Sequence, residues 1–129
     1  MKIKKFNFKT IKSTNDTAAR IIKQTNFKFG MVVAEKQFSG RGQYGRKWIS
    51  YKGNLFASFF HPFDENKFSI ERVTKLNCNL VKQTLSKYIK NYPATNLHTI
   101  TGKKINKSEL ENNLKLVFEN RISKMYKMN

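Results

Sequence analysis

The sequence predicts an α+β protein, a single domain over residues 1–129 in which strands precede the two longest helices. The chain has the length of one ordinary domain, and 39% of its residues are hydrophobic, which supports a packed core. Short segments with strand character occur before residue 61, whereas two stretches after residue 68 have apolar residues at helical spacing. This order differs from the regular strand and helix alternation of an α/β protein.

The first half of the chain contains three predicted strands and one predicted helix. Isoleucine and phenylalanine between lysines indicate a short strand over residues 3–8. The Ser-Thr-Asn-Asp segment at 13–16 has a hydroxyl followed three positions later by an acid, a capping-box pattern that predicts a helix over about 14–24. Residues 31–36 have the β-branched and apolar content of a buried strand, and residues 55–60 predict another strand.

Two long helices are predicted in the second half, over residues 69–90 and 107–125, because apolar residues recur there at intervals of three and four. The connection at 92–102 contains a proline and ends at a glycine. Cys78 lies among leucines of the first of these helices, which favours a buried apolar role. It is the only cysteine, so a disulfide within the chain is excluded, and a reducing cytoplasm is the expected location.

The net charge of +18, from 26 basic and 8 acidic residues, raises nucleic acid or an anionic surface as a partner. The lysines are scattered along the whole chain, however, and such diffuse charge gives weak, salt-sensitive contacts, so no specific nucleic acid is expected. No stretch approaches the roughly 20 apolar residues of a membrane span, and the start lacks the apolar segment of a signal peptide. Two histidines and one cysteine give no metal-ligand spacing.

The segment from residue 40 to 48 combines glycines with cations and ends at the only tryptophan. Its members of these kinds are Gly40, Arg41, Gly42, Gly45, Arg46, Lys47 and Trp48. Glycines let backbone amides approach a ligand closely, and the cations bring positive charge to it, so the segment is typical of a phosphate-binding loop. The alternative is a flexible basic loop between strands. A strand follows instead of a helix, which argues against a P-loop or a Rossmann fingerprint.

Four polar residues elsewhere, and the tryptophan, have both a structural and a functional interpretation. Ser13, Thr14 and Asn15 are residue types that favour helix starts, and they can equally line a site. The Gln37 amide offers a donor and an acceptor to a urea-like ligand, or it satisfies the end of a strand. Trp48 is more typical of a core or a loop anchor than of a stacking platform.

Together these segments resemble the catalytic domain of biotin protein ligases of the class without a DNA-binding module. The similarity consists of Ser-Thr-Asn at 13–15, a strand ending near Gln37, Gly-Arg-Gly-x-x-Gly-Arg-x-Trp at 40–48, and Gly-Asn-Leu with a following serine at 53–58. Order and spacing agree over residues 10–60. The resemblance implies a biotin/lipoate ligase-like fold, a mixed sheet flanked by helices. Lipoate ligases share that architecture, but the glycine and arginine spacing favours the biotin branch.

The resemblance also implies roles for particular residues. Those expected to line a biotin pocket are Ser13, Thr14, Asn15 and Gln37. Those expected in the loop over the adenylate are Gly40, Arg41, Gly42, Gln43, Gly45, Arg46 and Trp48, with glutamine at 43 where many relatives have arginine. The implied reaction uses biotin and ATP, with Mg²⁺ bound to the ATP, to form biotinyl-AMP. The implied partner is the biotin carboxyl-carrier domain of a carboxylase, which accepts biotin on a lysine.

The chain departs from the family in one respect. The family's Lys-Trp-Pro-Asn-Asp segment, which carries its central lysine, and a Gly-Ile-Gly-Ile-Asn-like strand are both missing. The long helix passes almost directly into Tyr92, which indicates an internal deletion between an N-terminal part (1–91) and a C-terminal part (92–129). The catalytic residue is therefore unassigned, and open sheet edges and self-association are expected. The alternatives to an active ligase are a non-catalytic biotin-binding remnant and a weak basic nucleic-acid-binding protein.

Overall fold

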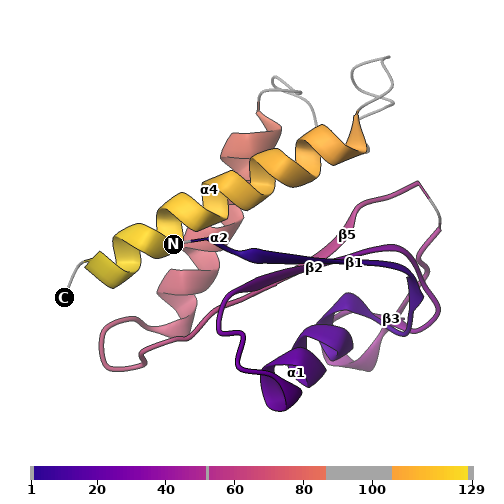
Figure 1. Ribbon diagram of the computed structural model, residues 1–129, viewed down its shortest axis with the longest axis horizontal. Coiled ribbons are helices and arrows are strands. Elements are labelled where there is room, and N and C mark those ends of the chain that lie inside the picture. Colours follow the sequence, from indigo (N-terminus) through magenta and orange to yellow (C-terminus); the bar gives the residue numbers. More distant parts are fainter. Residues whose placement is uncertain (1, 52, 87–105, 128–129) are drawn as a thin grey trace. The chain divides into compact units, whose positions relative to one another are not determined.

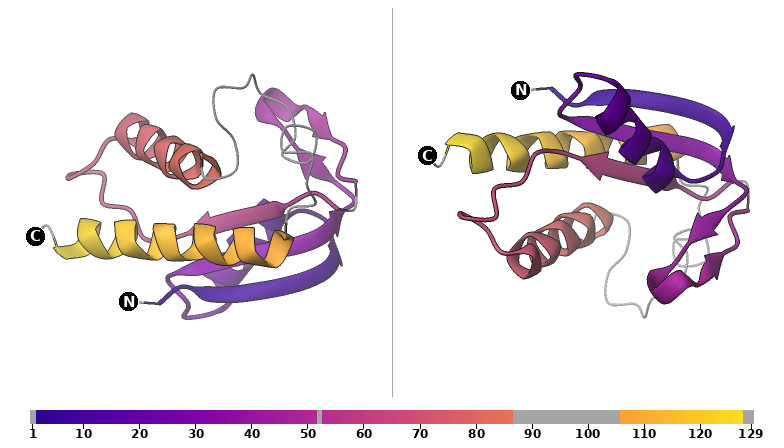
Figure 2. Two further views of the ribbon diagram at one scale, coloured as in Figure 1. Left: turned by 90° about the horizontal axis from the view of Figure 1, so that it is seen from above. Right: turned by 90° about the horizontal axis from the view of Figure 1, so that it is seen from below.

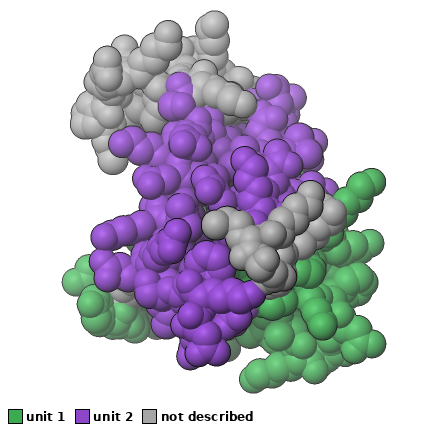
Figure 3. Space-filling model, turned by 90° about the vertical axis from the view of Figure 1, so that its left-hand side faces the viewer, with its two compact units in different colours: residues 1–62 green, residues 63–129 purple. Residues whose placement is uncertain are grey.

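The computed structural model describes residues 2–51, 53–86 and 106–127, apart from the side chains of residues 43, 126 and 127. The chain divides into two compact units, residues 1–62 and residues 63–129 (Figure 3). The expected single domain over 1–129 stays a prediction, and the expected junction between residues 91 and 92 lies outside the described residues.

Unit 1 contains one α-helix and a mixed sheet of three strands, with a small hairpin beside it (Figure 1). The elements in order are β1 (Lys4–Ile11), α1 (Thr14–Gln24), β2 (Gly30–Gln37), β3 (Gly40–Arg41), a 3₁₀ turn at Gln43–Gly45, β4 (Lys47–Trp48) and β5 (Phe56–Phe60). In the larger sheet β2 is central; it runs parallel to β1 and antiparallel to β5. The predicted α+β class with a mixed sheet is confirmed.

The start of α1 follows from its capping residue. Ser13 has extended backbone angles, and its hydroxyl accepts a hydrogen bond from the Asp16 backbone N–H at 3.0 Å. That bond satisfies one of the amides that a helix start leaves without an internal partner, and the Asp16 carboxylate favours the positive end of the helix dipole. The predicted helix over 14–24 is confirmed at both ends.

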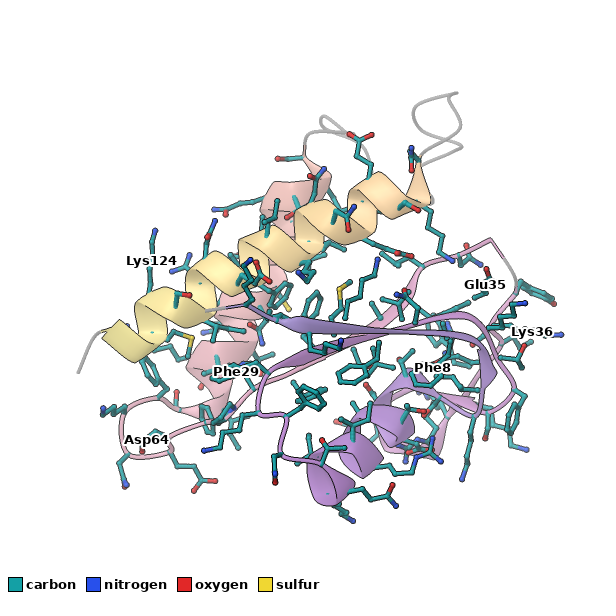
Figure 4. All side chains as sticks on the ribbon, viewed as in Figure 1. Phe8, Phe29, Glu35, Lys36, Asp64 and Lys124 are labelled. Carbon is teal, nitrogen blue, oxygen red and sulfur yellow. The ribbon has the colours of Figure 1, made fainter. Side chains whose placement is uncertain are left out.

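One face of the sheet packs against α1 (Figure 2), and a hydrophobic cluster of unit 1 lies between them. Ala18 of α1, Val32 of β2 and Phe60 of β5 are buried there. Phe8 of β1 packs against this cluster, on the side of the sheet that faces the helix (Figure 4). Side chains alternate across a strand, so Phe6 shares the face of Phe8 and packs against the same cluster. Ile3, the third apolar residue of the predicted strand, is buried but precedes β1.

The sheet has no room for a side chain at Gly30. It lies directly opposite Phe60 in the β2–β5 register. A Cβ atom at Gly30 would approach Phe60 Cζ to 2.2 Å, far inside van der Waals contact. The Phe60 ring therefore covers the backbone of the central strand, and it also stacks against Phe6 with the ring centroids 6.4 Å apart.

Among the described residues, β1 and β5 each pair with a strand on one side only, and this agrees with the prediction of open sheet edges. Self-association stays a prediction. No described helix is long and apolar enough to cross a membrane.

Unit 2 contains α2 (Ile70–Leu85) and α4 (Lys107–Lys127), which pack against each other. Ser69 and Asn106 begin them: the Ser69 hydroxyl accepts from the Arg72 amide at 3.1 Å, and Asn106 Oδ1 accepts from the Glu109 amide at 3.1 Å. The predicted helix at 107–125 is confirmed. The predicted helix at 69–90 is confirmed as far as Leu85, and its last residues, with the connection at 92–102, lie outside the described residues.

The prediction of a buried Cys78 is wrong, because the thiol is exposed. The buried positions of α2 are Leu80 and Thr84, one helical turn apart. Cys78 precedes Leu80 by two positions, about 200° around an α-helix, and therefore points away from that side. Neighbouring leucines in the sequence did not imply a shared face.

Candidate functional site

The start of α1, the end of β2, the β3–β4 hairpin and β5 enclose a cavity of about 730 Å³ in unit 1. Parallel pairing of β1 with β2 brings the carboxyl ends of both strands together, and α1 begins at the same edge. Antiparallel β5 begins near that edge, so its first residues complete the wall. Such an edge is where α and β folds commonly place ligands.

Most of the predicted site residues line this cavity. They are Ser13, Thr14, Asn15, Gln37, Arg41, Gly42, Arg46 and Trp48. Gly40 and Gly45 are not in the lining, and the side chain of Gln43 lies outside the described residues. Lys47, one of the cations of the predicted phosphate-binding segment, also lines it, together with residues for which no site role was predicted: Tyr44, Leu55, Phe56, Ala57 and Ser58. Their roles toward a ligand stay predictions.

The Gln37 amide joins two parts of the site. Its Oε1 accepts a hydrogen bond from the Thr14 backbone N–H at 2.7 Å, and its Nε2 donates to the Ser50 hydroxyl at 3.0 Å. Gln37 therefore holds the start of α1 and the segment after β4 in place, which is the structural role anticipated for a strand end. An amide has two protons and two acceptor lone pairs, so one of each remains for a ligand.

Gly40 is required by this same contact. Ser50 is buried, and a Cβ atom at Gly40 would lie 2.7 Å from its Oγ, 2.9 Å from the Trp48 carbonyl oxygen and 3.1 Å from Gln37 Nε2. Only glycine allows these groups to approach each other so closely. The prediction treated Gly40 as part of a phosphate cradle, whereas the structure shows it packed against the protein's own polar groups.

Ser58 connects β5 to the start of α1. Its hydroxyl forms hydrogen bonds with the Thr14 hydroxyl, at 2.8 Å, and with Asn15 Oδ1. Ser58 lies opposite Val32 in the β2–β5 register, and Val32 belongs to the core under α1, so Ser58 faces the helix. The sequence carried a signal for this residue in the alternation of Phe56, Ser58 and Phe60, which places all three on one face.

The cations of the site come from the hairpin. Arg41 forms an ion pair through Nη2 with Asp16 Oδ1, and Lys12 Nζ lies 3.8 Å from Asp16 Oδ2. Arg46 and Lys47 line the cavity and form no ion pair within the part of the chain that the structure describes. They supply positive charge that an anionic ligand can meet.

Trp48 and Tyr44 expose aromatic surface at the rim. Trp48 is 64% exposed, so of the two roles expected for it, a core residue or a loop anchor, the core role is wrong. It lies on a two-residue strand that pairs only with Gly40 and Arg41 among the described residues, and this small hairpin cannot bury a large ring. Tyr44 is 94% exposed and has a φ of 59°, a left-handed conformation uncommon for a residue with a side chain.

Metal ligation is not a feature of the described residues, which contain no group of three or more His, Cys, Asp or Glu side chains that could hold an ion. The cavity instead combines hydroxyls and amides at its helical end with arginine, lysine and aromatic groups at its hairpin end. This arrangement suits a ligand with one uncharged polar part and one anionic part.

The sequence model of the biotin/lipoate A/B protein ligase family matches residues 7–117. The chain belongs to this family. The match includes the whole cavity and extends into α4, so membership applies to both units of this ligase-like chain.

Solved biotin protein ligases have the same fold. The Aquifex aeolicus enzyme in complex with biotin and ATP has a TM-score of 0.74 at 20% identity, covering 94% of this chain and 71% of that one. An arginine-to-glycine variant of that enzyme, in complex with biotin, has a TM-score of 0.72 at 20% identity, with 96% and 72% covered. The Leishmania major enzyme in complex with biotinyl-5-AMP has a TM-score of 0.53 at 24% identity. That match covers 78% of this chain but only 42% of the Leishmania chain.

Proposed function

We propose that this chain is a biotin ligase domain. It binds biotin and MgATP in the 730 Å³ cavity, forms biotinyl-AMP, and transfers biotin to a lysine of a carboxyl-carrier domain in the cytoplasm. One observation carries the proposal: a single cavity joins the polar start of α1 to the cationic hairpin. Membership of the ligase family and the structural likeness to ligases that bind biotin, ATP or biotinyl-5-AMP support it.

The two ends of the cavity fit the two parts of the adenylate. Biotin has a urea-like ring with two N–H donors and one carbonyl acceptor, which the hydroxyls and amides of Thr14, Asn15 and Gln37 can complement. The AMP part carries a phosphate, which Arg41 and Arg46 can meet with charge-assisted hydrogen bonds. The apolar tail of biotin would lie between these ends.

The proposed chemistry has two displacements. An oxygen of the biotin carboxylate attacks the α-phosphorus of MgATP, the bond from that phosphorus to its bridging oxygen breaks, and pyrophosphate leaves. The amine of the carrier lysine then attacks the acyl carbon of biotinyl-AMP, AMP leaves, and the nitrogen loses a proton as the amide forms. Both transition states gather negative charge on oxygen, so the protein's contribution is positioning and cationic stabilisation.

The central lysine that the family resemblance leads us to expect is not in the sequence. Loss of one well-placed group that stabilises transition-state charge costs about 3 to 4 kcal/mol, or roughly 10²- to 10³-fold in rate. We therefore propose slow adenylate formation by a site whose binding residues are retained.

Calorimetry with biotin, followed by a pyrophosphate-release assay with biotin and MgATP, tests the proposal. Biotin-dependent pyrophosphate release, abolished when biotin is omitted, supports the ligase. Biotin binding without pyrophosphate release would instead assign a binding module without turnover. If biotin does not bind and the protein is retained on DNA in a salt-dependent way, the +18 charge is the functional feature and the ligase proposal is refuted.

A further inference from the structure

Asp16 does not line the cavity but contacts a residue that does. It belongs to the first turn of α1, and its carboxylate bonds to Arg41, which does line the cavity. The Asp16 side chain is 31% exposed and that of Arg41 58%. The second carboxylate oxygen lies 3.8 Å from Lys12 Nζ, so each oxygen faces one cation.

The two partners differ in how firmly the backbone holds them. The Asp16 backbone is fixed at the start of α1 by its hydrogen bond to Ser13. Arg41 lies on the two-residue strand β3, next to a turn in which Tyr44 and Gly45 both have positive φ. The ion pair therefore ties the hairpin to the helix, across 25 positions of sequence.

The bond leaves most of the guanidinium available. Arginine has five N–H donors in a planar fork, and the pair with Asp16 uses Nη2. Nη1 and Nε have no partner among the described residues, and Arg41 borders the cavity. With one edge of the fork held from outside the cavity, the other donors keep a fixed direction.

We propose that Asp16 is a positioning residue, which anchors Arg41 so that the free edge of its guanidinium meets the phosphate of the adenylate. The inference rests on the proposed function, since it assumes that this cavity binds biotinyl-AMP. Asp16 does not touch the ligand and acts only through Arg41.

The direction in which one substitution changes the affinity for the adenylate distinguishes this positioning role from a purely electrostatic effect. Removing a carboxylate near an anion site strengthens anion binding when charge alone matters. If Asp16 positions Arg41, its removal instead weakens binding of the anionic adenylate, because the guanidinium loses its direction. Glu35→Gln is the matched control: it removes the same charge from β2, is exposed, does not line the cavity, and has no ion pair in the described residues (Figure 4).

The experiment measures the Kd of a non-hydrolysable biotinyl-AMP analogue by calorimetry for wild type, Asp16→Asn, Glu35→Gln, Arg41→Ala and the Asp16→Asn/Arg41→Ala double variant. Exposed ion pairs are worth up to about 1 kcal/mol, so we expect Asp16→Asn to weaken binding roughly 2- to 5-fold. Glu35→Gln should leave binding unchanged or slightly tighter. In the Arg41→Ala background, Asp16→Asn should cause no further weakening.

A second measurement needs no ligand. Trypsin cleaves after arginine and lysine, and we expect Asp16→Asn to accelerate cleavage of the hairpin after Arg41, Arg46 and Lys47, while Glu35→Gln leaves it unchanged. Binding by Asp16→Asn that equals or exceeds wild type overturns the positioning role, and so does an unchanged cleavage rate. If wild type itself does not bind the analogue, the proposed function fails, and the cleavage rates still decide whether Asp16 anchors the hairpin.

Discussion

Replacing Gly40 by alanine tests whether the glycines of the hairpin serve the protein's own packing or a ligand. A Cβ atom at Gly40 would lie 2.7 Å from Ser50 Oγ and 2.9 Å from the Trp48 carbonyl oxygen. The Gln37 to Ser50 hydrogen bond must then break or shift, at about 1 kcal/mol, and the displaced backbone adds about 1 to 2 kcal/mol. We expect a loss of roughly 2 to 3 kcal/mol in the local stability of the hairpin.

Gly42→Ala is the matched control in the same hairpin. A Cβ atom at Gly42 would have no neighbour closer than 3.5 Å, which is ordinary van der Waals contact. Its φ is not positive, so alanine fits the backbone, and the change in stability should be within about 0.5 kcal/mol of zero or slightly favourable.

The assay uses the only tryptophan, because Trp48 lies on β4 and its fluorescence reports the hairpin itself. Urea titration of Trp48 emission gives the unfolding free energy of wild type and both variants, and calorimetry gives their biotin affinity. Gly40→Ala should unfold at lower urea and bind biotin more weakly, since Gln37 loses its Ser50 partner. Equal unfolding free energies for the Gly40→Ala and Gly42→Ala variants would refute the packing argument.

Four further substitutions test other parts of unit 1. Gly30→Ala would force the Phe60 ring out of its place, and we expect a loss of about 2 to 4 kcal/mol in unfolding free energy, measured by urea-dependent circular dichroism; a loss below 0.5 kcal/mol would contradict the close packing. Ser58→Ala removes a shared hydrogen-bond partner of the α1 start, so biotin binding measured by calorimetry should weaken roughly 3- to 10-fold while overall stability falls by about 1 kcal/mol; unchanged binding would exclude Ser58 from the site. Arg46→Ala should lower the rate of pyrophosphate release and leave biotin affinity unchanged. Gln37→Ala should mainly lower biotin affinity. If both variants change the two measurements equally, the cavity does not have separate biotin and phosphate ends.

The parts of the fold that sequence predicted well are those determined by neighbours along the chain. The start of α1 follows from a hydroxyl and the amide three positions later, and β2 follows from a continuous apolar run. Both signals are local, so they do not depend on how the rest of the chain folds. The gathering of Thr14, Gln37 and Arg41 around one cavity was predictable only through the family resemblance.

The features that sequence did not predict depend on long-range geometry. The pairing of Asp16 with Arg41 joins residues 25 positions apart, and the bond of Ser58 to Thr14 joins residues 44 apart. Neither follows from spacing, because each depends on how the helix lies on the sheet. The exposure of Trp48 was missed for a related reason, since composition cannot reveal that a tryptophan lies on a two-residue strand.

The three hydrogen-bonding groups at the polar end of the cavity have a fixed polarity. The Asn15 Oδ1 atom can only accept, so the proton on Ser58 Oγ must point to it. Ser58 then has no proton left for Thr14, and the Thr14 hydroxyl must donate to Ser58. This one-way relay leaves acceptor lone pairs on Thr14 and donor protons on the Asn15 amide nitrogen. The hydrogen-bonding groups of the cavity are therefore asymmetric before any ligand binds. A ligand with its donor and acceptor positions exchanged would place donor against donor and acceptor against acceptor.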